Sequence, residues 1–146
     1  MSKKYISFWI FCFIGLDFVS KILVEKIGKN FWIIPNFFRC YKTRNFNLAL
    51  SIPLPTILQI FFSGVLLLLL IFFWRKLIEK NFWSDLAMIL IFSGGIANFL
   101  QRIIFGFVTD FLVIWKFPIF NFADTFIFFG VTILFFLEIK KKSQNQ

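Results

Sequence analysis

The stretch Leu54–Trp74 reads LPTILQIFFSGVLLLLLIFFW and decides the fold class, because it carries no charged residue. A helix of about 20 apolar residues, rising 1.5 Å per residue, crosses the hydrocarbon core of a bilayer. The whole chain has the same character: 60% of its 146 residues are hydrophobic, 23% are aromatic and the mean hydropathy is +0.85. Soluble domains are nearer about 45–50% apolar. The composition therefore predicts a membrane protein.

Three further stretches reach the length of a membrane span. A backbone in lipid must satisfy its own hydrogen bonds, so each stretch is expected to be a helix. The first has the basic start and apolar run of a signal peptide, but no small-residue cleavage site follows it, and we interpret it as a retained helix. The sequence predicts one domain over residues 1–146, an all-α bundle of four transmembrane helices at about 5–24, 54–74, 82–104 and 123–139.

The basic residues give an orientation for this bundle. The net charge of +9 does not indicate nucleic-acid binding, because Lys and Arg cluster at the ends of the spans. Short flanking segments rich in Lys and Arg remain in the cytoplasm. There are three such segments: Lys3–Lys4 before helix one, Arg75–Lys80 between helices two and three, and Lys140–Lys142 after helix four. Their positions place both termini in the cytoplasm.

The opposite, extracytoplasmic side receives the long loop 25–53. Its FWIIPNFF and RNFNLALSI pieces alternate loosely and contain β-forming residues, so we expect a small strand-rich platform there. Pro53 and Pro55 suit the beginning of the second helix. The polar tail 143–146 is expected to be disordered.

Phe105–Phe129 reads FGFVTDFLVIWKFPIFNFADTFIFF, and it holds Asp110 and Asp124 in nearly apolar surroundings. An aspartate at the centre of a membrane helix is unfavourable by about 3 kcal/mol. Each aspartate has a structural explanation when taken alone, since Asp124 could cap a helix and Asp110 could lie in a turn. Two carboxylates flanking one short loop favour a function for the pair.

Other polar side chains converge on the same level of the bundle, the outer membrane–water boundary. Structural explanations exist for these too: an intrahelical ion pair for Asp17 and Lys21, close helix packing for Gly94, and snorkelling of Arg102 to headgroups. Structural accidents would be distributed over both faces, whereas convergence at one depth indicates a site. The set comprises Asp17, Lys21, Asn45, Asn98, Arg102, Asp110, Asn121 and Asp124, and Gly94 lies on the same helix stripe as Asn98 and Arg102.

The residue types in this set restrict the chemistry. The chain has no His and only two Cys, so a zinc site of the usual kind is not expected, and we expect no cofactor. No Ser or Cys has a visible base partner, which disfavours nucleophilic catalysis. Two close carboxylates can share one proton, so that the pair activates a water and also protonates a carbonyl oxygen. This is the aspartic-protease mechanism.

Five short motifs then resemble the lipoprotein signal peptidases, the type II signal peptidases of bacteria. LDFVSK (Leu16–Lys21) resembles LDxxTK, NFNLALS (Asn45–Ser51) resembles NxGxAFS, and GGIANFLQR (Gly94–Arg102) resembles GGAxGNLxDR. VTDF (Val108–Phe111) and FNFADT (Phe120–Thr125) match VxDF and FNxAD. Each motif alone is weak, but five in order on a four-span chain form a specific pattern.

The resemblance implies a function and a set of partners. Asp110 and Asp124 would be the catalytic aspartates of an intramembrane endopeptidase, and the other polar residues of the set would support them and bind substrate. The substrate would be a prolipoprotein carrying diacylglyceryl on a cysteine, cut on the N-terminal side of that cysteine. The enzyme would lie in the bacterial inner membrane among its lipids, with its site at the outer face, and a globomycin-type peptide would be expected to inhibit it.

The chain also departs from the family pattern. Asn47 stands where the family usually has Gly, Ala97 where it has Gly, Leu50 where it has Phe and Ser20 where it has Thr. Gln101 replaces a common Asp next to Arg102, which removes a possible partner for that arginine.

Two other functions compete with the peptidase. A small transport or proton-relay protein would also carry intramembrane Asp, Lys and Arg, but it would need polar groups at mid-depth in several helices. A descendant that binds lipoproteins without cutting them is the other alternative, and the presence of both aspartates argues against it.

Overall fold

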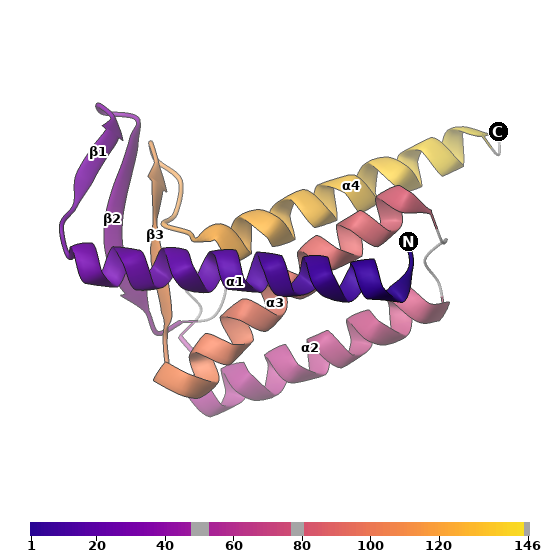
Figure 1. Cartoon of the computed structure of the whole chain (residues 1–146), viewed down its shortest axis with the longest axis horizontal. Helices are drawn as coiled ribbons and strands as arrows, with labels where there is room; N and C mark the ends of the chain where they lie inside the picture. The colour runs from indigo at the N-terminus through magenta and orange to yellow at the C-terminus, as the bar shows by residue number, and fades with distance from the viewer. Residues whose placement is uncertain (48–52, 77–80, 145–146) are drawn as a thin grey trace.

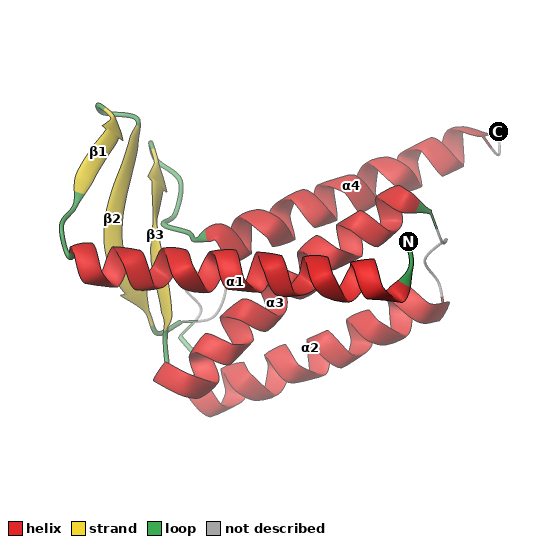
Figure 2. Cartoon of the chain, viewed as in Figure 1, coloured by secondary structure: helices red, strands yellow, loops and turns green. Residues whose placement is uncertain are grey.

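The computed structural model describes residues 1–47, 53–76 and 81–144, and it has the predicted architecture (Figures 1 and 2). Four helices lie along one another: α1 (Lys3–Ile27), α2 (Thr56–Lys76), α3 (Phe82–Phe105) and α4 (Phe122–Gln144). All four are long and apolar enough to cross a membrane. The four-span bundle with a small strand platform is therefore confirmed.

Helix boundaries differ from the prediction in three places. The first helix extends to Ile27 and ends at Gly28, whose φ of 62° provides a left-handed cap, so Glu25 belongs to the helix and not to the outer loop. The second helix begins at Thr56, after Pro53 and Pro55, and ends at Lys76. The polar tail was predicted to be disordered, but α4 continues through Ser143 to Gln144.

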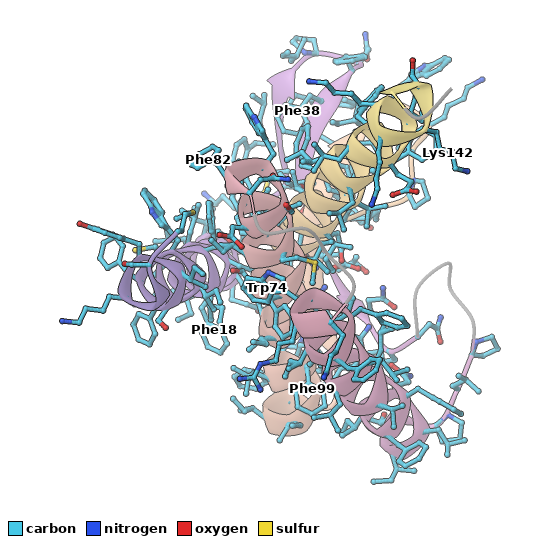
Figure 3. The ribbon with its side chains drawn as sticks, turned by 90° about the vertical axis from the view of Figure 1, so that its right-hand side faces the viewer. Phe18, Phe38, Trp74, Phe82, Phe99 and Lys142 are labelled. Carbon is cyan, nitrogen blue, oxygen red and sulfur yellow. The ribbon has the colours of Figure 1, made fainter. Side chains whose placement is uncertain are left out.

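Helix α3 is the central helix of the bundle. In its most apolar window 50% of the residues are buried, against 6–17% in the other three helices. Figure 3 looks nearly along the helices and shows α3 between α1 on one side and α2 and α4 on the other. The outer helices leave large apolar side chains such as Phe11, Leu68 and Phe135 exposed. Lipid is the natural solvent for these surfaces.

A three-stranded antiparallel sheet lies at the end of the bundle opposite the two termini (Figure 1). Its order is β1 (Phe31–Ile34), β2 (Phe38–Asn45), β3 (Val108–Ile114). The first two strands come from the outer loop, as predicted, although residues 48–52 of that loop lie outside the described residues. The third strand follows α3, where a turn was the structural alternative for Asp110; that alternative is wrong, because Asp110 lies in β3 opposite Thr43.

Helices α3 and α4 approach each other closely at two glycines. A Cβ atom on Gly94 would overlap the carbonyl oxygen of Ala123, and one on Gly130 would meet Ala87 and Ile91 of α3. Small residues allow such contacts between membrane helices. Because Ala123 precedes Asp124, the Gly94 contact also determines where the first turn of α4 lies.

We predict that Gly94→Ala destabilises the protein by about 1–3 kcal/mol, the usual penalty for inserting a methylene into a packed interface. The added methyl group would push the backbone of Ala123 away from α3. Thermal unfolding in detergent measures this effect. Gly15→Ala is the matched control, since a Cβ at Gly15 has no neighbour within 4 Å. Equal unfolding temperatures for the two variants would contradict the prediction.

Candidate active site

Asp124 lies in the first turn of α4 and forms a reciprocal cap with Asn121. The Asn121 side-chain oxygen accepts from the Asp124 N–H at 3.0 Å, and the Asn121 N–H donates to Asp124 Oδ2 at 3.3 Å. This is the geometry of a capping box, in which two residues three apart satisfy each other's backbone donors. The capping role considered for Asp124 is therefore real, and it also fixes the orientation of the carboxylate.

Asp110 comes from β3 and meets the same asparagine. Asn121 Nδ2 donates to Asp110 Oδ1 at 2.6 Å, and Asn45 Nδ2 donates to Asp110 Oδ2 at 2.9 Å. Asn121 is fully buried and Asp110 is nearly so. A single asparagine thus contacts both predicted aspartates, one through its side-chain amide and the other through its capping interactions.

A further polar layer connects the aspartates to α1 and α3. Asn98 Nδ2 donates to Asp124 Oδ1 at 2.8 Å, while Asn98 Oδ1 accepts from Lys21 at 3.0 Å. Lys21 also pairs with Asp17 Oδ2 at 2.7 Å, and the other Asp17 oxygen accepts from the Ala123 N–H at 2.9 Å. The ion pair of α1 is therefore more than an intrahelical neutralisation, because it joins α1 to both α3 and α4.

The pKa of Asp110 is raised from its usual range to about 6. Burial is the main cause, because it disfavours the charged carboxylate, and the negative charge of Asp124 adds to the effect. Hydrogen bonds from Asn45 and Asn121 and the charge of Lys21 act in the opposite direction. The environment therefore makes Asp110 easier to protonate than an ordinary aspartate.

Every hydrogen-bond partner that the structure describes for Arg102 is a neutral group. Its Nε donates to Gln59 Oε1 at 3.0 Å, and its terminal nitrogens donate to the carbonyl oxygens of Asn98 and Asn47 at 3.4 and 3.3 Å. Gln59 is 1% exposed, and its Nε2 donates to the carbonyls of Phe46 and Leu54, both at 2.7 Å. Snorkelling of Arg102 is not observed, because its side chain is buried.

Sequence reasoning missed Gln59. It is the one Gln in the apolar stretch that opened the sequence analysis, and an amide in lipid needs partners. That signal was present in the sequence, but nothing in the sequence indicated that the partners would be Arg102 and two carbonyls of the outer loop.

The departures from the family pattern are accommodated locally. Gln101 does not contact Arg102; its side-chain oxygen accepts from the Thr109 N–H at 3.0 Å, at the edge of β3 next to Asp110. Among the described residues, non-glycine positive φ angles occur at Asn36 and Trp115 and not at Asn47, so Asn47 needs no glycine-like turn. Ala97 is buried, Ser20 donates to the Asp17 carbonyl, and Leu50 lies outside the described residues.

Both aspartates line one groove of about 1040 Å³ between α2, α3 and α4. The polar groups lie at the end nearest the sheet, where Asn45, Asn98 and Arg102 join the two carboxylates. The remainder of the lining is almost entirely apolar and includes Leu66, Leu70 and Phe128. A segment that is apolar along its length and polar at one end would fit this groove.

Comparisons with known proteins agree with this geometry. A family model described as signal peptidase (SPase) II matches residues 9–140. The lipoprotein signal peptidases of Staphylococcus aureus strains JH9 and Newman are each 34% identical, over 100% of this chain and 96% of theirs. Two bacterial membrane enzymes solved by the in meso method, at 2.3 and 1.9 Å resolution, superpose with TM-scores of 0.90 and 0.84. Their sequences are 26% and 27% identical, and the matches cover 99% and 94% of this chain and 93% and 94% of those structures. Asp110 and Asp124, joined by Asn121, thus lie in a chain that belongs to the signal peptidase II family, the membrane aspartic peptidases that process lipoproteins.

Proposed function

We propose that Asp110 and Asp124 perform the peptidase reaction of this family as one catalytic pair. The observation that carries the proposal is the position of Asn121, which hydrogen-bonds Asp110 at 2.6 Å and caps Asp124 through both its N–H and its Oδ1. The charge of Asp124 helps to raise the pKa of Asp110, and two carboxyl groups that interact in this way titrate as a pair and can retain one proton between them. The raised pKa of Asp110 supports this protonation state.

The reaction follows from one protonated and one ionised carboxyl group. The ionised member takes a proton from a water molecule, whose oxygen attacks the carbonyl carbon of the scissile peptide bond. The protonated member donates its proton to the carbonyl oxygen, so that a neutral tetrahedral intermediate forms. When the C–N bond breaks, the departing nitrogen takes a proton from one carboxyl group. One hydroxyl of the intermediate gives its proton to the other carboxyl group as the carbonyl re-forms, so the pair returns to its initial state with one proton.

The other predicted residues have positioning roles in this proposal. Asn98 and Asn121 orient Asp124, Asn45 and Asn121 orient Asp110, and Gly94 lets α4 lie close to α3. Lys21 is neutralised in part by Asp17 and reaches the pair through Asn98. Arg102 lines the groove and has N–H groups suited to holding substrate carbonyls.

The groove supports a diacylglyceryl-modified prolipoprotein as the substrate. Its apolar length suits a signal-peptide segment and acyl chains, while its polar end suits the peptide bond next to the modified cysteine. Cleavage on the N-terminal side of that cysteine would leave the lipid on the product. A globomycin-type peptide with an apolar tail would compete for the same groove.

The proposed location is the bacterial inner membrane, with both termini in the cytoplasm and the site at the outer face. The termini lie at one end of the bundle and the sheet at the other (Figure 1). The last turns of α2 and α4, at the end with the termini, carry Lys and Arg residues, which is consistent with the positive-inside rule. The proposed unit is the single domain 1–146.

We predict that Asp110→Asn and Asp124→Asn each lower cleavage of a diacylglyceryl-modified prolipoprotein by at least about a hundredfold, the low end of general acid–base contributions. An amide can neither take a proton from water nor supply one to the carbonyl. A gel shift with purified protein in detergent measures cleavage. Asp85→Asn is the matched control, since Asp85 is a buried carboxylate that is paired with the amino terminus and does not line the groove.

Full activity in either variant would exclude the proposed pair. A folded wild-type protein that binds this substrate without cutting it would favour the non-catalytic alternative.

We predict that kcat/KM falls as the pH rises through about 6, because Asp110 then loses the proton that the pair must retain. Asn45→Ala removes a hydrogen bond that stabilises the ionised Asp110 and so raises its pKa further. The basic limb of the pH profile should therefore move to higher pH in this variant. A shift to lower pH would contradict the assignment of that limb to Asp110.

We predict that Gln59→Leu destabilises the protein by about 1–3 kcal/mol, the usual effect of leaving buried polar groups unpaired. The substitution removes the partner of Arg102 Nε and of two carbonyls. It should also raise KM more than it lowers kcat, because Arg102 would hold substrate less well. Unfolding in detergent and initial rates measure the two effects. Ile57→Leu, at a neighbouring position that is 71% exposed, should change neither.

A further inference from the structure

A second, smaller cavity lies at the tip of the sheet, apart from the groove. It has a volume of about 180 Å³ between the turn that joins β1 to β2 and the loop that follows β3. We name it the tip pocket; its lining residues are Trp32, Asn36, Phe37, Arg39, Val113 and Trp115. None of these residues lines the catalytic groove.

Arg39 provides the positive charge of the tip pocket. Its guanidinium carbon lies 5.4 Å from the ring centre of Trp32 and 4.8 Å from that of Tyr41. Within the described part of the chain no acidic group forms an ion pair with Arg39, whereas Lys42 and Arg44 on the same strand both pair with Glu25. Aromatic rings hold a guanidinium in place without neutralising its charge. Arg39 is therefore an oriented cation that retains its capacity for an anion.

The backbone around the pocket is held in an uncommon conformation. Asn36 and Trp115 have φ angles of 57° and 46°, and the Trp115 N–H donates to the Phe37 carbonyl at 2.7 Å. A left-handed conformation is acceptable for Asn but unfavourable for a bulky aromatic residue. This contact joins the loop after β3 to the β1–β2 turn, and it leaves the Trp115 indole 63% exposed beside Lys116. Such local strain is found where a particular side-chain position has a use.

The surroundings of the pocket indicate the kind of ligand. Phe37 and Trp115 are at least half exposed. In Figure 1 the strands run across the direction of the helices, so the tip projects to one side of the bundle, beyond α1. It lies at the same end of the bundle as the start of α4. Exposed tryptophans together with basic residues are typical of the membrane–water interface, and anionic headgroups attract such basic residues. A water-soluble acidic peptide would satisfy Arg39 but would leave the aromatic side chains in water.

We propose that the tip pocket binds the headgroup phosphate of an anionic phospholipid, with Arg39 as the anion-binding residue and Trp32 and Trp115 at the level of the headgroups. Arg39 of β2 lies opposite Val113 of β3, and Val113 is three residues from Asp110 along β3. A lipid bound there would hold the outer end of β3 against the membrane surface. The proposal is independent of the peptidase mechanism, because the residues of the tip pocket are not those that hold the two aspartates.

Lipid retention by the full chain tests this proposal without measuring activity. The purified protein is titrated in detergent with phosphatidylglycerol or phosphatidylcholine, and the bound lipid is counted by native mass spectrometry. Arg39→Gln should weaken phosphatidylglycerol binding about fivefold, which corresponds to about 1 kcal/mol for one basic residue at an anionic surface. It should weaken phosphatidylcholine binding less, because the choline ammonium of that lipid already offsets the charge of its phosphate. Arg44→Gln is the matched control: the same change on the same strand, at an arginine that already has Glu25 as a partner.

A second variant covers the case in which Arg39→Gln fails to fold. Trp115→Gly removes the indole at a position whose φ suits glycine, so it should weaken phosphatidylglycerol binding without destabilising the chain. Undiminished binding in these variants, or equal binding of both lipids by the wild type, would overturn the proposal. Displacement of phosphatidylglycerol by inorganic phosphate or by a soluble acidic peptide would assign the pocket to a water-soluble anion instead.

Discussion

The placement of two carboxylates, Asp110 buried and Asp124 half-buried, against one buried asparagine is the constraint on which the rest of the structure depends. Asp110 and Asp124 come from a strand and a helix, and Asn121 satisfies an oxygen of each. Buried charges are tolerated only when they are hydrogen-bonded and their surroundings are fixed. The positions of β3 and α4 are therefore tied to each other through this residue, and the nearby contacts of Gly94 and Ala123 set how closely α4 can lie against α3.

Among the described contacts, neither cation near the site pairs directly with Asp110 or Asp124; each has a side-chain amide as a partner. Lys21 donates to Asn98, which in turn donates to Asp124, and Arg102 donates to Gln59. A direct ion pair would depress the pKa of a carboxyl group. With amides as the immediate partners, burial remains the dominant influence on Asp110, and its pKa stays near 6. This arrangement suits a pair that must hold a proton, whereas direct salt bridges would suit two permanent anions.

The sheet has a different role from the helices. Helix α3 occupies the centre of the bundle and carries Asn98 and Arg102 to the level of the site, while the sheet brings Asp110 and Asn45 to the same level from outside the membrane spans. Gln101 reaches the open edge of β3 at Thr109, and Glu25 at the end of α1 contacts the same threonine. Strand β3 is thus attached to two helices as well as to its neighbouring strand.

The sequence by itself determined the four spans, the strand-forming outer loop and the identity of the polar set, because hydropathy, charge position and motif order are local properties of the chain. It also placed that set at one level, since span direction and helical spacing determine depth. Only the tertiary structure decided which side chains meet. Whether Asp110 lies in a turn or a strand depends on pairing with β2, and the role of Gln59 depends on Arg102, 43 residues away in the chain. Gln101 and Arg102 are adjacent in the chain but have different partners, Thr109 and Gln59. Adjacent side chains on a helix point in different directions, and only the packing of the neighbouring elements decides which residues each side chain meets.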